Sequence, residues 1–184
     1  MAESAIYPSL RDRVVFVSGG ASGIGAAIVE QFCLQGAKVS FVDIDADAAA
    51  SLADDIAARD LPRPRFLPCD LKDVEALQYT IGQVITADGP ITALINNAAN
   101  DERHTIDDVT PAYFDDRIAV NLRHQFFATQ AVHGPMAEAG GGAIVNIGSV
   151  TWLIGQGGMP CYSASKAGVA GLTRSLARDL GPKN

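Results

Sequence analysis

The 184-residue sequence has no cluster of Lys and Arg, no long apolar run and few cysteines. With 14 basic and 21 acidic residues its net charge is −7, and it lacks the basic stripe that binds a nucleic-acid backbone. No apolar run approaches the roughly 20 residues that span a bilayer, and the first residues lack the apolar core of a signal peptide. We therefore expect a cytoplasmic protein that binds neither nucleic acid nor a membrane.

The few cysteines and histidines lack the spacing of metal ligands. An odd number of cysteines with no metal pattern suits a reducing cytoplasm, so we predict no disulfide framework and no metal site. Surface or packing roles are expected for the histidines, although His104 is also a substrate candidate. These residues are Cys33, Cys69, Cys161, His104, His124 and His133.

Hydrophobic residues make up 48% of the chain and charged residues 19%, which is typical of a globular protein, and the length suits one domain, 1–184. Val/Ile-rich runs without polar alternation suit strands that are buried on both faces of a parallel sheet. Their alternation with helix-like segments predicts a doubly wound α/β sheet with ligands beyond the carboxyl ends of the strands. The predicted strands are 14–17, 38–42, 65–68, 92–95 and 143–147; the predicted helices are 23–34, 46–59, 74–87, 110–137 and 162–180.

A glycine-rich turn, SGGASGIG at 18–25, joins the first strand to the first helix. Gly19 allows a tight turn, Gly23 lets the backbone approach a phosphate, and Gly25 lets the helix pack closely on the strand. The backbone N–H groups of this helix N-terminus, around Ser22 and Ile24, would then face a pyrophosphate. The spacing is G-x-x-x-G-x-G rather than the G-x-G-x-x-G fingerprint, and an ordinary glycine turn is the alternative.

Acidic residues follow the next two strands. Asp43 is placed to accept hydrogen bonds from an adenosine ribose, and its carboxylate would repel a 2′-phosphate, which favours NAD over NADP. The alternative is that Asp43, with Asp45 and Asp47, caps the following helix. Asp70, beside Leu71, could meet the adenine amino group or lie in a solvated loop.

Tyr162 and Lys166 stand four residues apart in a predicted helix and therefore share one of its faces. A free tyrosine has a pKa near 10 and is a poor base at neutral pH. One positive charge at about 5 Å, with an effective dielectric of about 20, favours the phenolate by about 3 kcal/mol, or roughly two pKa units. That shift would bring the phenol into the catalytic range. Ser149 lies upstream, at the end of an apolar run.

In combination, these motifs resemble the short-chain dehydrogenase/reductase family over nearly the whole chain and in the right order. The resemblance implies a Rossmann-type fold, a nicotinamide cofactor and a catalytic Asn-Ser-Tyr-Lys tetrad. It rests on the glycine turn, Asp70, Asn96-Asn97-Ala98, Asn121, Ser149 and the YSASK sequence of 162–166.

The resemblance implies a role for each member of the tetrad. Tyr162 would be the general base in alcohol oxidation, or the acid in carbonyl reduction. Lys166 would lower the pKa of Tyr162 and bind the nicotinamide ribose. Ser149 would hold the substrate oxygen, and Asn121 would support a water-linked proton path to Lys166.

Around the fourth strand, the resemblance implies that Asn97 braces the central strand and that Ala98 and Ala99 lie beside the cofactor. Two residues depart from the usual family pattern. Ser18 stands where the family has threonine, which keeps the hydroxyl. Ala99 replaces the glycine of the usual NNAG, which could shift the backbone slightly.

A narrower resemblance is to bacterial aldose 1-dehydrogenases of the xylose or arabinose type, through SAIYPSL at 4–10, NNAANDERH at 96–104 and VNLRHQFFATQAV at 120–132. It implies oxidation of the anomeric carbon of a sugar to a lactone. Polar residues after the fourth strand could bind several hydroxyls, and an indole packs well on a sugar ring. A solvated loop and a loop anchor are the alternatives. The candidate substrate residues are Ser149, Trp152, Asn100, Asp101 and His104, with Glu102, Arg103 and Gln156 nearby.

The sequence ends soon after the last predicted helix, whereas family members normally continue with two more strands and a mobile substrate-covering segment. An apolar strand at 143–147 would then lie at the sheet edge, which is an aggregation hazard. We therefore expect a C-terminally truncated domain with the catalytic residues but little or no turnover alone. Equal rates of NAD reduction by this chain and by an extended one would contradict that expectation.

Two further expectations concern assembly and substrate. The family resemblance implies a homodimer or homotetramer formed through the 110–137 and 162–180 helices. The leading function is NAD-dependent oxidation of a sugar or polyol. The alternatives are a dehydrogenase for another secondary alcohol or a 3-oxoacyl substrate, and a non-catalytic nucleotide-binding fragment; the direction of the reaction stays open.

Overall fold

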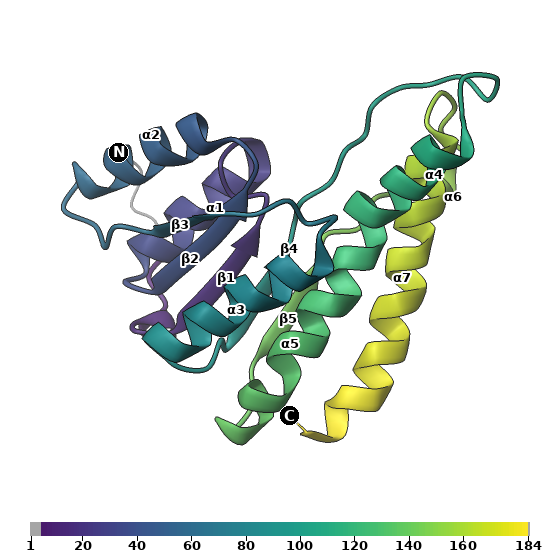
Figure 1. The fold of residues 1–184 in the computed structure, drawn as a ribbon. Helices are drawn as coiled ribbons and strands as arrows, with labels where there is room; N and C mark the ends of the chain where they lie inside the picture. Colours follow the sequence, from purple (N-terminus) through teal and green to yellow (C-terminus); the bar gives the residue numbers. More distant parts are fainter. Residues whose placement is uncertain (1–4, 184) are drawn as a thin grey trace.

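Five parallel strands form the central sheet in the order β3-β2-β1-β4-β5 (Figure 1). The computed structural model describes residues 5–183, so that Ser4 of the SAIYPSL segment lies outside the described residues. The chain moves outward from β1 to β3 and then returns to the other side of β1 for β4 and β5. The order therefore reverses between β1 and β4, as the predicted doubly wound fold requires. The strands are β1 Val14–Ser18, β2 Lys38–Asp43, β3 Arg65–Pro68, β4 Ala93–Asn96 and β5 Ala143–Asn146.

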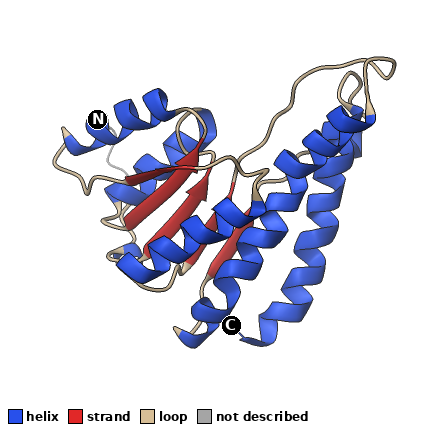
Figure 2. Cartoon of the chain, in the orientation of Figure 1, coloured by secondary structure: helices blue, strands red, loops and turns tan. Residues whose placement is uncertain are grey.

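Helices cover both faces of the sheet (Figure 2). Alternate residues of β1 pack against the helices on opposite faces. Val14 and Phe16 pack on one face and Val15 on the other, because successive strand side chains point to opposite faces. The first face is covered by α3 Val74–Asp88 and α5 His124–Glu138. The second is covered by α1 Gly23–Leu34 and α2 Ala46–Ala57. All five residues of β1 are buried, so the sheet has two apolar cores.

Side chains at the N-caps accept hydrogen bonds at the start of three of the helices. Asp45 accepts from the Ala48 N–H at the start of α2, and Asp73 accepts from the Ala76 N–H at the start of α3. Thr110 accepts from a first-turn N–H of α4, Pro111–Ile118. Each cap satisfies one of the N–H groups that a helix start leaves open.

The predicted single helix at 110–137 is wrong in its middle. The chain forms α4, then a π-helical segment (η2) Ala119–Arg123, and then α5. A π turn inserts one extra residue, which a 3.6-residue hydrophobic period does not indicate, and such turns are frequent at functional sites. Asn121 lies within this segment.

Short helical segments were also not predicted. They are the 3₁₀ turns η1 Pro8–Leu10 and η3 Gly181–Lys183, and the single turn α6 Thr151–Ile154. The last long helix, α7 Pro160–Leu180, begins two residues before the predicted start and runs alongside α5 (Figure 1). Between residues 5 and 183, every helix is too short or too polar to cross a bilayer.

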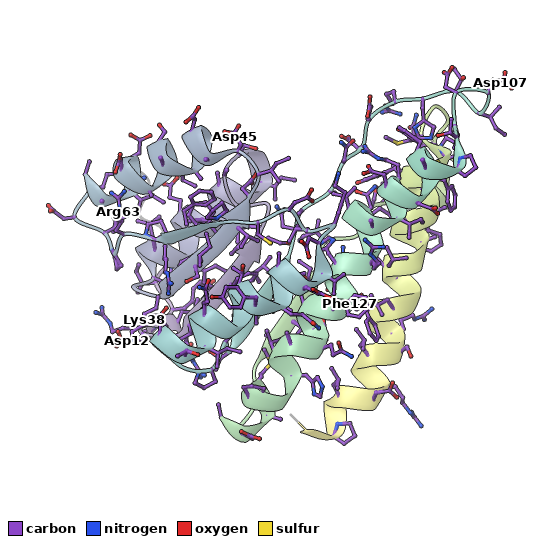
Figure 3. All side chains as sticks on the ribbon, in the orientation of Figure 1. Asp12, Lys38, Asp45, Arg63, Asp107 and Phe127 are labelled. Atoms are coloured by element: carbon purple, nitrogen blue, oxygen red, sulfur yellow. The ribbon has the colours of Figure 1, made fainter. Side chains whose placement is uncertain are left out.

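A long loop leaves β4 and returns to the sheet through α4. Figure 3 shows Asp107 at the tip of this loop, far from Lys38 and Arg63 at the opposite end of the molecule. The loop reaches the start of α7, where the His104 N–H donates to the Gly158 carbonyl at 2.9 Å. It therefore brings residues after β4 close to the helix that carries Tyr162.

Candidate active site

A cleft of about 590 Å³ opens at the carboxyl ends of the strands, where the doubly wound topology places ligands. It brings together the glycine turn, the residues that follow β2, β3 and β4, and the Tyr162–Lys166 pair. Among residues 5–183, no group of three His, Cys, Asp or Glu is arranged to hold a metal ion. The predicted site residues in its lining are Gly19, Ser22, Gly23, Ile24, Gly25, Asp43, Asp70, Leu71, Asn97, Ala98, Asn100, Asp101, Tyr162 and Lys166.

The glycine turn leaves room for a bound group at the start of α1. A Cβ on Gly25 would lie 1.8 Å from the Gly19 carbonyl oxygen, so the helix can approach the strand this closely only with glycine there. A Cβ on Gly23 would instead meet nothing within 4 Å and would project into open space. Ser22, the N-cap of α1, makes no side-chain capping bond, unlike the caps of α2, α3 and α4. The turn therefore fits a pyrophosphate, because the first-turn N–H groups of α1 stay open to the cleft.

Ser18 and Asn97 lock the glycine turn to the end of β4. The Ser18 hydroxyl accepts from the N–H groups of Asn97 and Ala98 at 3.1 and 3.2 Å. In return, Asn97 Nδ2 donates to the Ser18 and Gly19 carbonyls at 3.2 and 2.9 Å. A serine at this position thus makes the bracing contacts, which need a hydroxyl and no methyl group.

Asp43 organises the turn after β2 rather than capping α2. Its Oδ2 accepts from the Ala21 N–H at 2.9 Å, and its Oδ1 accepts from the N–H groups of Ile44 and Asp45. The cap of α2 is Asp45. Three backbone donors hold the Asp43 carboxylate against the glycine turn, at the edge of the cleft. Oδ1 already accepts from two donors, whereas Oδ2 accepts from one and keeps a lone pair for a further donor.

A chain of ion pairs that the sequence did not indicate crosses the same cleft. Lys72 donates to Asp116 at 3.0 Å and lies 3.7 Å from Asp70, while Asp116 also pairs with Arg117. Hydrogen bonds from Arg117 and then from Lys72 lower the pKa of Asp116 below its ordinary value. Lys72 and Asp116 are 44 residues apart in the chain, so only the tertiary fold brings them together. Val120 and Ile147 also line the cleft and were not predicted.

Tyr162 and Lys166 lie together, as their spacing predicts. Lys166 Nζ is 5.6 Å from the centre of the Tyr162 ring. The lysine is 1% exposed and donates to the Ile147 carbonyl at 2.7 Å. Burial lowers the pKa of Lys166 from 10.5 to about 8, so the amine is still mainly protonated at neutral pH. Within residues 5–183, this carbonyl is its hydrogen-bond acceptor, which leaves two of its protons for groups in the cleft.

Asn121 is fully buried, and both ends of its amide bind the backbone of Asn100. Its Oδ1 accepts from the Asn100 N–H at 2.7 Å, and its Nδ2 donates to the Asn100 carbonyl at 3.0 Å. The π-helical segment thus fixes the start of the loop that follows β4. The role of Asn121 in a proton path stays a prediction.

The remaining predicted residues lie outside the cleft lining. Ser149 Oγ donates to the Thr151 hydroxyl at 3.1 Å and accepts from the Thr151 N–H at 3.2 Å. Trp152 is 41% exposed on α6, and Gln156 is exposed just after that helix. Both ring nitrogens of His104 lie within hydrogen-bond distance of protein atoms. Substrate binding by these residues stays a prediction.

A doubly wound parallel sheet, with an open helix start and a tyrosine–lysine pair at its carboxyl edge, defines a class of dinucleotide-binding oxidoreductases. Comparison with known families makes the assignment specific. The family model for short chain dehydrogenases matches residues 13–184, and the chain therefore belongs to the short-chain dehydrogenase family. It is an oxidoreductase that uses a nicotinamide cofactor and acts on small molecules.

Similar proteins include two bacterial sugar dehydrogenases. The D-xylose 1-dehydrogenase of Caulobacter vibrioides is 46% identical over 179 residues, which are 97% of this chain and 70% of that protein. The "Probable galactose dehydrogenase GalD" of Rhizobium meliloti is 46% identical over 181 residues, 98% of this chain and 71% of that protein. The crystal structure of a short chain dehydrogenase from Mycobacterium smegmatis has a TM-score of 0.91 and 30% identity, with 100% of this chain and 77% of that one covered.

Proposed function

We propose that this chain is an NAD-dependent aldose dehydrogenase that oxidises the anomeric hydroxyl of a sugar to a lactone. The observation that carries the proposal is the position of the buried Lys166 beside Tyr162, at the end of a cleft that begins at the glycine turn. The 46% identity to a D-xylose 1-dehydrogenase supports a sugar as substrate. Asn100 and Asp101, which line the cleft near this pair, can bind sugar hydroxyls.

In the proposed reaction, Tyr162 takes the proton of the anomeric hydroxyl as the C1–H bond breaks. The cleft residues from the glycine turn to Lys166 would hold the nicotinamide cofactor, which would supply the hydride acceptor for C1, so that C1 becomes the lactone carbonyl carbon. The Lys166 ammonium stabilises the negative charge on the Tyr162 oxygen, and its two free protons can bind ribose hydroxyls. Ser149 holds the reacting oxygen, and Asn121 holds the loop at Asn100 so that the sugar side of the cleft keeps its shape.

A panel of substrates tests the proposal. With NAD, and with the chain extended through the two strands that the family resemblance implies, we expect formation of reduced nicotinamide with pentose and hexose aldoses, and little or none with polyols or apolar secondary alcohols. A dehydrogenase for apolar alcohols is the second candidate, because Val150, Leu153 and Ile154 beside Ser149 are 62%, 65% and 67% exposed. A rate with an apolar alcohol and none with any aldose would replace the first candidate by the second.

We expect the Asp43 carboxylate to give NAD an advantage in kcat/KM over NADP on the order of 100-fold. A second negative charge a few ångströms away would cost about 3 kcal/mol at an effective dielectric of about 20 to 30. Asp43→Asn removes the charge and keeps an acceptor oxygen, so the NAD preference should fall at least about tenfold. Asp45→Asn is the matched control, since it alters the neighbouring cap of α2. An equal loss of preference in both variants would contradict the assignment.

The proposed enzyme is a homodimer or homotetramer, in which the 110–137 and 162–180 regions pair with their copies. Phe114 on α4 and Phe126 on α5 are 43% and 42% exposed, which supports burial of this surface in an assembly. Light scattering at micromolar concentration should give at least twice the chain mass. Phe126→Glu should lower it toward the monomer; a monomeric unsubstituted protein would contradict the proposal.

A further inference from the structure

The helix that carries Tyr162 and Lys166 begins without a capping side chain of its own. The N-cap of α7 is Met159, which makes no side-chain cap hydrogen bond, and Pro160 at the first helical position has no N–H. A thioether is a weak acceptor and does not replace the Ser, Thr, Asp or Asn oxygen of an ordinary cap. By contrast, α2, α3 and α4 all begin with a side-chain oxygen that accepts from the helix. The first turn of α7 therefore depends on an acceptor from elsewhere.

His104 supplies that acceptor from the loop after β4. The Cys161 N–H, in the first turn of α7, donates to His104 Nε2 at 3.3 Å. A backbone N–H can only donate, so Nε2 must accept and the ring proton must be on Nδ1. Nδ1 lies 3.0 Å from both the Glu102 carbonyl and the Tyr113 hydroxyl, and either oxygen can accept that proton. Protein atoms thus occupy both nitrogens of His104.

Neighbouring contacts hold His104 in this position. The His104 N–H donates to the Gly158 carbonyl at 2.9 Å, and Arg103 Nη1 donates to the Gly157 carbonyl at 3.2 Å. On the other side, the ring of Tyr113 packs edge-on against the imidazole with 5.1 Å between the ring centres. The imidazole is therefore held between α4 and the segment that leads into α7.

We infer that His104 is a positioning residue for the proposed reaction, and that it acts by capping the first turn of α7. The inference rests on the proposed function, because Tyr162 follows Cys161 directly and lies in the same turn. A helix frays first at an end with open N–H groups. Opening of this turn would move the Tyr162 oxygen away from Lys166, which lies one turn deeper and is held by Ile147. His104 keeps the two groups together without touching the sugar.

Amide hydrogen exchange of the cofactor-free protein tests the cap directly. In the unsubstituted protein, the Cys161 amide should be protected despite its place in the first turn. In His104→Leu, it should exchange at least about tenfold faster. In the same variant, kcat with an aldose should fall about 10- to 100-fold while the dissociation constant of NAD stays within about threefold. His104→Gln, whose amide oxygen reaches the place of Nε2, should restore exchange and kcat to within about threefold.

Tyr113→Phe is the matched control, because it removes the hydroxyl next to Nδ1 and leaves the acceptor at Nε2. It should leave Cys161 exchange and kcat within about threefold of the unsubstituted protein. An unprotected Cys161 amide in the unsubstituted protein, or unchanged exchange in His104→Leu, would overturn the inference. A higher KM for the sugar with unchanged exchange would show substrate contact instead. A lack of activity with every aldose would refute the proposed function. The exchange results would still show whether His104 caps the first turn of α7.

Discussion

Tyr162→Phe should lower kcat for aldose oxidation by about 100- to 10,000-fold and leave the affinity for NAD within about threefold. The substitution removes the oxygen that takes the substrate proton, and general base catalysis of this kind contributes about 10²- to 10⁴-fold. The phenyl ring can still lie over the Lys166 ammonium, now 5.6 Å from the ring centre, so that the fold and the cleft persist. Steady-state kinetics and NAD binding, monitored by nucleotide fluorescence, measure the two quantities separately.

The matched control is Tyr79→Phe, because Tyr79 is 70% exposed on α3 and makes no described contact with the cleft. It should change kcat by less than about twofold. Retention of NAD-linked activity in Tyr162→Phe would show that another group takes the proton, and the assignment of Tyr162 would be wrong. Loss of both kcat and NAD binding would point to a damaged cleft, which a thermal denaturation curve would reveal.

The strands could be predicted because their signal is local. Parallel strands that are buried on both faces are continuous apolar runs, and β1, with five buried residues, is the clearest case. The break between α4 and α5 could not be predicted in this way. Its π turn contains Asn121, which binds the Asn100 backbone 21 residues away, and no hydrophobic period encodes such a contact.

In the candidate site, too, the residues with a local sequence signal were predicted, and the contacts between distant residues were missed. Gly25 and the Tyr162–Lys166 pair were predicted because each rests on a short spacing within one turn or helix. The Lys72–Asp116 pair was missed because its residues come from different elements, and any of the many exposed charges could have been its partner. His104 was predicted as a substrate residue from its place after β4. Its contact with Cys161, 57 residues away, became visible only in three dimensions.

Gly25→Ala should destabilise the protein by about 3 kcal/mol and abolish detectable NAD binding. The added methyl carbon would lie 1.8 Å from the Gly19 carbonyl oxygen and 2.7 Å from Asn97 Nδ2, and the first of these is backbone that cannot rotate away. Overpacking of this kind typically costs about 1 to 3 kcal/mol, occasionally more. The strain must push α1 away from β1, which moves the first-turn N–H groups out of line with the cleft. For a chain of this size, the midpoint of thermal unfolding should fall by about 6 to 12 °C.

Gly82→Ala separates this clash from the general effect of replacing a helical glycine. Gly82 lies within α3, and a Cβ there would meet nothing within 4 Å. Alanine should stabilise that helix by about 0.4 to 1 kcal/mol, because it restricts the unfolded chain and favours helix, so the midpoint should rise by a few degrees. NAD binding should be unchanged. If Gly25→Ala binds NAD as tightly as Gly82→Ala does, close packing of α1 on β1 is not what shapes the pyrophosphate end of the cleft.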